Sequence, residues 1–183
     1  MEKSINLIEV EVRGLLSEEK FYELTEYLNS RSSLVEKDDK ISYFFVVENA
    51  ILKISDETSR DRAQISFKVG DESKSILEEY DIPILRTHVE TAVSLFRELG
   101  LKNVNRVTQT RCNYLYERAC VSLKHTPDWG YHFELEMKAS NSQEAKNIKK
   151  ELLALCKKLD VKNMTPSEIK AFVRKINERH GFI

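Results

Sequence analysis

The clearest pattern in this chain is the alternation of apolar and charged residues, which predicts β-strands with one face of each kind. Residues 8–14 read Ile-Glu-Val-Glu-Val-Arg-Gly, with the apolar residues on one face. The charged residues line the opposite face: Glu9, Glu11 and Arg13. On this stretch alone the alternatives stay open, because such a strand can turn its polar face to solvent or to a site that holds a cation and an anion.

A second stretch near the other end repeats the pattern and changes its meaning. Residues 131–138 read Tyr-His-Phe-Glu-Leu-Glu-Met-Lys, so that His132, Glu134, Glu136 and Lys138 share the polar face. If the two polar faces turn toward one cavity, four carboxylates meet, and bound metal would relieve their repulsion. Hard carboxylate oxygens suit Mg²⁺ or Mn²⁺ better than a soft metal.

Further alternating or β-rich stretches predict strands at 41–47, 51–55, 62–69, 76–82, 103–114 and 116–124. Apolar residues at helical spacing predict helices from Ser17 to about 29–33, at 85–99 and at 141–159, and a last helix from a capping box at Thr165 to beyond Ile176. No repeat or linker divides the chain, so we expect a single domain over 1–183, with the strands within 5–138 and the C-terminal helices within 141–180.

These elements predict an α+β fold, a closed antiparallel β-barrel of about eight strands. In this arrangement the apolar faces point outward beneath the helices, and the charged faces meet in a central tunnel. The alternative is an open sheet whose polar faces lie in solvent.

Composition narrows the function classes. The 183 residues include 29 Lys and Arg and 30 Asp and Glu, so the net charge of −1 gives no bulk attraction to nucleic acid. No apolar run approaches the roughly 20 residues of a membrane span, and the first residues do not form an apolar signal segment. Three cysteines without metal-type spacing suit reduced thiols. We therefore expect a cytoplasmic protein that binds neither nucleic acid nor membrane.

Two motifs and the order of elements between them resemble the CYTH superfamily of triphosphate tunnel metalloenzymes. These are Glu9-Val-Glu11-Val-Arg13 and Trp129-Gly130-Tyr-His-Phe-Glu134-Leu-Glu136. The length is similar to that of the class IV adenylyl cyclase and thiamine triphosphatase branch. The resemblance implies that Glu9, Glu11, Glu134 and Glu136 are catalytic and bind Mg²⁺ or Mn²⁺. It also implies that the phosphates contact Arg13, Lys53, Lys68 and Arg111.

The chain departs from the family pattern at several charged positions. Arg13 replaces a lysine, and neutral residues replace basic ones at Ser55, Leu77 and Gln109. Lys124 stands where an acid is expected, although Asp128 lies nearby, and Ser42 replaces the Asp before the Tyr-Phe pair. Glu79 and Asp81 correspond to a further pair of family acids.

Three function classes follow from the resemblance and its departures. The first is a metal-dependent phosphohydrolase or nucleotidyl cyclase acting on ATP, tripolyphosphate or thiamine triphosphate. The second is a catalytically degenerate tunnel that binds a nucleotide, polyphosphate or other anion without turnover. The third is a structural or interaction domain with a vestigial cavity. An exposed flank of the barrel could support a homodimer.

Overall fold

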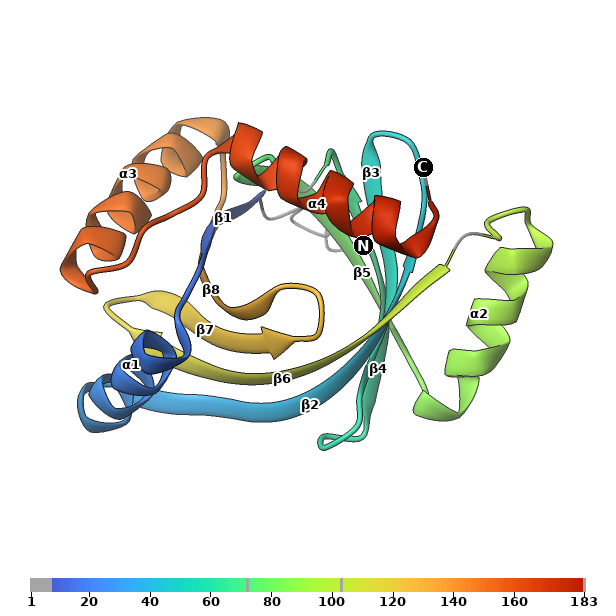
Figure 1. Cartoon of the computed structure of the whole chain (residues 1–183). Coiled ribbons are helices and arrows are strands. Elements are labelled where there is room, and N and C mark those ends of the chain that lie inside the picture. Colours follow the sequence, from blue (N-terminus) through green and yellow to red (C-terminus); the bar gives the residue numbers. More distant parts are fainter. Residues whose placement is uncertain (1–7, 72, 103, 183) are drawn as a thin grey trace.

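The computed structural model describes residues 8–71, 73–102 and 104–182, so residue 5 and Asn103, which bounded predicted strands, lie outside the described part. The described strands form a closed antiparallel barrel in the order β1-β5-β4-β3-β2-β6-β7-β8 (Figure 1). Their bounds are β1 Ile8–Leu15, β2 Ser33–Phe45, β3 Ala50–Glu57, β4 Arg62–Val69, β5 Ile76–Ile84, β6 Val104–Tyr116, β7 Ala119–Thr126 and β8 Gly130–Ala139. The predicted α+β barrel is confirmed.

The two Glu-x-Glu strands, β1 and β8, are neighbours in the barrel. They pair along the whole of β1, which sets Glu11 opposite Glu136 and Arg13 opposite Glu134. On its other side β1 pairs with β5 only from Ile8 to Val10. The polar faces of both strands turn inward, since the opposite faces bury their valine, leucine and phenylalanine side chains in the core.

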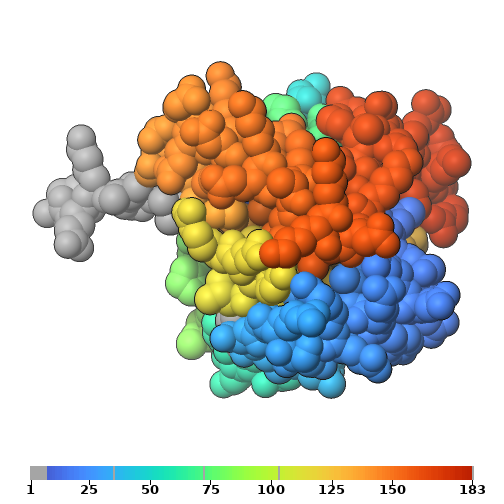
Figure 2. Space-filling model, turned by 90° about the vertical axis from the view of Figure 1, so that its left-hand side faces the viewer, coloured from blue at the N-terminus to red at the C-terminus, as the bar shows by residue number. Residues whose placement is uncertain are grey.

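Helices cover much of the outside of the barrel. Their bounds are α1 Glu18–Arg31, α2 Val89–Glu98, α3 Ser142–Lys158 and α4 Pro166–His180. Helix α3 packs on β1 and β8 through residues such as Leu152, and α2 buries Val89 and Val93 against β2 and β3. Figure 2 shows α1 and α3 side by side on one flank, with the β6–β7 turn between them.

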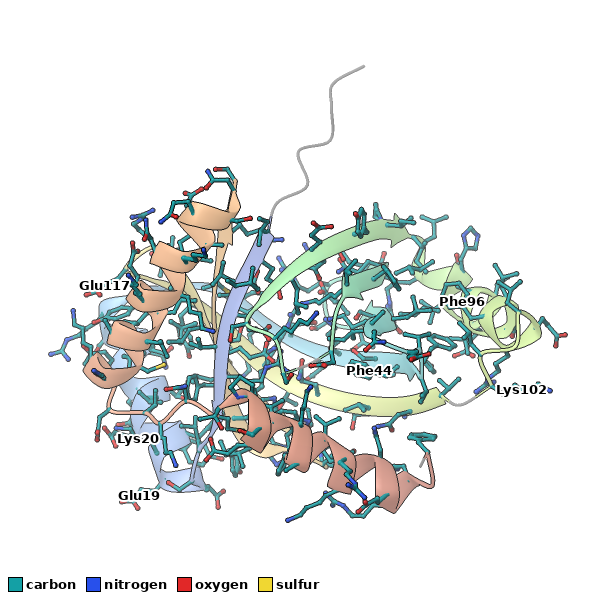
Figure 3. All side chains as sticks on the ribbon, turned by 90° about the horizontal axis from the view of Figure 1, so that it is seen from above. Glu19, Lys20, Phe44, Phe96, Lys102 and Glu117 are labelled. Carbon is teal, nitrogen blue, oxygen red and sulfur yellow. The ribbon has the colours of Figure 1, made fainter. Side chains whose placement is uncertain are left out.

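Helix α4 lies across one end of the barrel (Figures 1 and 3). It begins with the predicted capping box, in which Thr165 accepts from the backbone N–H of Glu168 and the Glu168 side chain accepts from that of Thr165. It ends at Gly181, whose left-handed φ of 71° suits glycine. Two contacts fix it to barrel loops, an ion pair of Lys170 with Asp71 at 3.3 Å and a hydrogen bond between His180 and Asp128 at 3.0 Å.

Strand β2 begins at Ser33, eight residues before the predicted start at Ile41, and ends at Phe45 rather than at Val47. Charged residues on both faces of its first half, in the run Glu-Lys-Asp-Asp-Lys, hide the alternation that predicts a strand. Pairing with β6 along its length holds this half in the sheet.

Smaller differences occur at the other element ends. Strand β7 begins at Ala119 rather than at 116, because Glu117 and Arg118 form the β6–β7 turn with positive φ. The helix predicted from residue 85 begins with a 3₁₀ turn, Arg86–His88, before α2. Both changes depend on the local backbone conformation, which the spacing of apolar side chains does not predict.

The helices leave part of the flank formed by β4 and β5 uncovered, and an exposed flank of this kind is what the predicted homodimer would need. Phe67 and Val69 on β4 and Tyr80 and Ile82 on β5 are between 38% and 58% exposed. The homodimer stays a prediction. No helix in the described ranges is both long and apolar enough to cross a membrane.

Candidate functional site

The barrel encloses a cavity of about 320 Å³ that opens beneath α4. Five basic side chains reach it from five different strands: Arg13, Lys40, Lys53, Lys68 and Lys124. Glu11 and Glu134 are the acids that reach it from the strands, Asp71 and Asp128 line it from loops, and apolar residues of α4 and of the β2–β3 turn form the rim. Phe44, near the end of β2, projects from the barrel wall at this end (Figure 3).

The predicted acids are inside the barrel and not in bulk solvent. Glu9 is 3% exposed and Glu11 5%, and the side chain of Glu134 is 16% exposed. Alternation along the strands places them there, because every second residue of a barrel strand points to the interior. Burying charge is costly unless it is paired, so the partners of each acid determine what the site can do.

Glu9, Lys68 and Glu79 form a compact group at one side of the tunnel. The Lys68 ammonium contacts Glu9 and lies 3.5 Å from Glu79. Burial alone would raise the pKa of Glu9, but its hydrogen bond with Glu79 and the charge of Lys68 lower it to about 2. Burial and the same hydrogen bond raise the pKa of Glu79 to about 7. Glu79 therefore holds a proton over much of the acid range and donates it to the Glu9 carboxylate.

Glu134 lies on β8, the neighbour of β1, and is paired with bases. Lys124 contacts its carboxylate, and Arg13 Nε lies 3.9 Å away. Despite burial, the charges of Lys124 and Arg13 hold the pKa of Glu134 well below its ordinary value. Lys124, which replaces an expected acid, thus sits against one of the predicted metal ligands. Arg13 also contacts Glu11 and lies over the Trp129 ring, 5.8 Å from its centre.

Glu11 and Glu136 are the acids best suited to a hard cation. They face each other across the β1–β8 pair, an arrangement that is unfavourable for like charges. Burial, followed by the nearby charge of Glu9, raises the pKa of Glu136, and Oε1 of Glu11 has Arg13 as its partner. Among the described residues no three acids, histidines or cysteines are grouped as a metal site. Two carboxylates still fit Mg²⁺, which takes one or two from protein and completes its shell with water and phosphate oxygens.

Lys40 and Lys53 are the basic residues of the cavity that no described carboxylate pairs within 4 Å. Burial, followed by the charge of Lys68, lowers the pKa of Lys53 to about 8. Burial also lowers the pKa of Lys40 well below its ordinary value, with Lys53 and Arg111 adding to the effect. Positive charge is therefore in excess here, and an anion would relieve it.

The sequence analysis missed Lys40. It lies in the half of β2 that was not predicted as a strand. Its spacing of two from Ser42, at the inward face of the predicted part, was the signal that could have found it.

Arg111 is placed differently from the other predicted phosphate contacts. Its guanidinium lies 2.7 Å from Glu57 and 3.3 Å from Asp38, and it does not line the cavity. Its role as a phosphate contact stays a prediction. His132 lines the cavity, and burial and Lys124 lower its pKa to about 4, so it is neutral at physiological pH.

Comparison with protein families gives a match to the CYTH domain over residues 7–167, most of the chain. The chain belongs to the CYTH domain family. No curated protein matches its sequence. Two positions that depart from the CYTH pattern, Ser42 and Ser55, place neutral side chains inside the barrel. Ser55 is fully buried, and its hydroxyl lies 3.4 Å from that of Ser42.

Solved structures share the CYTH fold at low sequence identity. A conserved hypothetical protein from Pyrococcus furiosus has 21% identity and a TM-score of 0.72, covering 84% of this chain and 91% of that one. HpAC1 from Hippeastrum, described as having a dominant triphosphatase activity, has 15% identity and a TM-score of 0.61, covering 86% and 89%. The Mimivirus capping enzyme triphosphatase has 12% identity and a TM-score of 0.51, covering 85% and 90%.

Proposed function

We propose that the cavity binds the phosphate chain of a triphosphate together with a divalent cation and promotes reaction at a phosphoryl group. The observation that carries this proposal is the pair of amino groups of Lys40 and Lys53, which line the cavity and which no described carboxylate pairs within 4 Å. A triphosphate carries several negative charges, and charge-assisted contacts to two unpaired ammoniums need break no existing ion pair.

Glu11 and Glu136 would hold the cation, with Glu9 and Glu134 beside them. When bound, Mg²⁺ or Mn²⁺ would neutralise charge that develops on the phosphoryl oxygens. Lys53, Lys68 and Arg13 would fix the chain by contacts to its non-bridging oxygens, with Lys40 as an added contact. The cavity wall and α4 exclude bulk water, which strengthens each of these contacts.

The activities of the neighbours support a triphosphate as substrate, either ATP, thiamine triphosphate or inorganic tripolyphosphate. Hydrolysis and cyclisation need the same clamp and differ in whether water or a ribose hydroxyl is positioned for attack. The protein would accordingly be a hydrolase or a lyase, acting in the cytoplasm.

The decisive experiment measures release of orthophosphate and pyrophosphate from ATP, thiamine triphosphate and tripolyphosphate, with Mg²⁺ and with Mn²⁺. Orthophosphate indicates a triphosphatase, and pyrophosphate with cyclic nucleotide indicates a cyclase. The matched control is Lys53→Met, which keeps the chain length of the side chain and removes its charge. Failure of tripolyphosphate to bind in calorimetry, with either metal, would contradict the proposal.

A second candidate is a tunnel that binds an anion without turnover. The contact between Lys124 and Glu134 favours it, because an ammonium there takes the place of a cation. The double variant Lys124→Asp with Gln109→Lys restores the family charges at both positions. Activity in this variant but not in the wild type would establish the degenerate tunnel. If the variant neither binds tripolyphosphate better nor turns it over, while the wild type binds an unrelated anion tightly, the enzyme hypothesis is wrong.

A further inference from the structure

A second group of charged residues occupies the barrel at the end opposite α4. It consists of three arginines and three acids from β2, β3, β4, β6 and the β3–β4 turn: Glu36, Asp38, Glu57, Arg60, Arg62 and Arg111. We call this group the ionic plug. Figure 1 shows the β3–β4 turn and α4 at opposite ends of the barrel.

Arg111 is the centre of the plug. It projects inward from β6, and its guanidinium lies 2.7 Å from Glu57, 3.3 Å from Asp38 and 3.8 Å from Glu36. Asp38 is 2% exposed and Glu57 6%, so these contacts are buried. The carboxylates come from two strands, β2 and β3, which Arg111 ties to β6.

The β3–β4 turn and the first residue of β4 add a second layer to the plug. Arg62 lies 2.5 Å from Glu57 and 2.8 Å from Glu36, and Arg60 also contacts Glu36. Ser59 donates to Asp38 at 2.6 Å, and Asn113 donates to Glu36 at 2.9 Å. Every acid of the plug therefore has at least two partners, which is what burial of charge requires.

The cavity stops where the plug begins. Lys40 and Gln109 face each other across the β2–β6 pair, and both line the cavity. The next inward pair along these strands is Asp38 with Arg111, and no plug residue lines the cavity. The ion pairs of the plug thus begin two residues further along each strand than the last residues that line the cavity.

We propose that the tunnel is open at one end only, beneath α4, and that it takes a phosphate chain by its terminal phosphoryl group. The inference rests on the proposed function and adds the class of ligand. The site recognises short polyphosphates and the free ends of long ones, and it excludes internal segments of a chain. Threading a chain through the barrel would separate Arg111 from its buried carboxylates, which is strongly unfavourable.

The number of protein molecules bound per polyphosphate tests this inference. We would titrate the wild type with tripolyphosphate and with long linear polyphosphate, and measure stoichiometry by calorimetry and by light scattering. A one-ended cavity admits two protein molecules per linear chain at saturation, one for each terminus. A long chain whose two terminal phosphates are esterified with bulky groups should not bind. The Lys53→Met variant, in which binding within the cavity is weakened, separates that binding from binding to the outer surface, which the variant leaves unchanged.

Removing the central ion pair of the plug should raise the number of protein molecules bound per long chain. Arg111→Ala with Glu57→Ala keeps the net charge and removes the central contact, and thermal unfolding verifies that it folds. We expect more than two molecules per long chain for this variant and undiminished binding of tripolyphosphate.

More than two molecules per chain for the wild type would overturn the inference and leave the proposed function standing. Loss of tripolyphosphate binding in the double variant would also overturn it, because Arg111 would then be a phosphate contact. No binding of tripolyphosphate to the wild type would overturn the proposed function and this inference together.

Discussion

Lys53 should make anion binding depend on pH in a defined way. Its pKa is about 8 in the folded protein against an ordinary value of 10.5, because burial and then the charge of Lys68 disfavour the ammonium form. A bound phosphate favours that form and raises the pKa again. Binding at pH 8, where about half of the Lys53 side chains are neutral, should therefore take up about half a proton.

The magnitude follows from the size of the shift. Recovery of the full difference between 8 and 10.5 would correspond to about 3 kcal/mol of favourable coupling, an upper value because the ligand restores only part of it. The contribution of Lys53 to affinity should be nearly constant below pH 7 and fall by up to about tenfold per pH unit above pH 8. The sign is fixed, because deprotonation removes the charge that holds the anion.

Calorimetry in buffers with different ionisation enthalpies measures the number of protons directly. Tripolyphosphate without metal is the ligand of choice, because metal binding could release the proton of Glu79 and mask the uptake. Lys53→Met should abolish most of the uptake, and the surface variant Lys102→Met should leave it unchanged. An uptake at pH 8 that persists in Lys53→Met would refute the reasoning.

Three other predictions concern the acids and the packing of β1. Glu134→Gln and Glu9→Gln should each abolish turnover while changing tripolyphosphate affinity far less, which steady-state rates and calorimetry separate; equal loss of both would contradict a role in chemistry. Glu79→Gln should stabilise the protein by up to about 3 kcal/mol above pH 7 and hardly at all below pH 4.5, since the raised pKa of about 7 costs stability only where the unfolded carboxyl ionises. Urea unfolding at pH 4.5 and pH 8 checks this, and an equal difference at both values would count against it. Gly14→Ala should cost about 1 to 3 kcal/mol in the same assay, because its Cβ would lie 2.2 Å from the Lys162 carbonyl oxygen and 2.7 Å from the Phe133 ring; a neutral substitution would show that β1 and the α3–α4 connection can move apart.

The barrel could be predicted because several strands carry one apolar and one charged face. In β1 and β8 the apolar faces are buried beneath α3, and the charged faces have only the interior left to occupy. The spacing of residues predicted the strand face on which each glutamate lies but not the residue that pairs with it. The register that sets Glu11 opposite Glu136 depends on contacts between strands far apart in the sequence, and the alternation within one strand does not determine it.

The first half of β2 shows where such reasoning fails. Its inward residues Glu36, Asp38 and Lys40 alternate with polar residues that face outward, so neither face reads as apolar. The strand is held by its pairing with β6 and by ion pairs to β3 and the β3–β4 turn, contacts made with residues up to 82 positions away. For this reason the prediction missed Lys40 in the cavity and Glu36 and Asp38 in the plug.

Most of the charges in this tunnel are already paired by the protein itself, and this bears on how a ligand would bind. Glu9 is paired with Lys68, Glu134 with Lys124 and Glu11 with Arg13, which leaves Lys40 and Lys53 as the basic residues of the cavity wall without a carboxylate partner in the described part of the chain. An anion that meets only these two lysines adds contacts and breaks none. A triphosphate with its cation needs more, because Lys68 and Arg13 must turn from carboxylate to phosphate while the cation takes their place against the acids. Such an exchange keeps every buried charge compensated at each end point, so the same ion pairs that hold the empty barrel together can act as the site without a large change of fold.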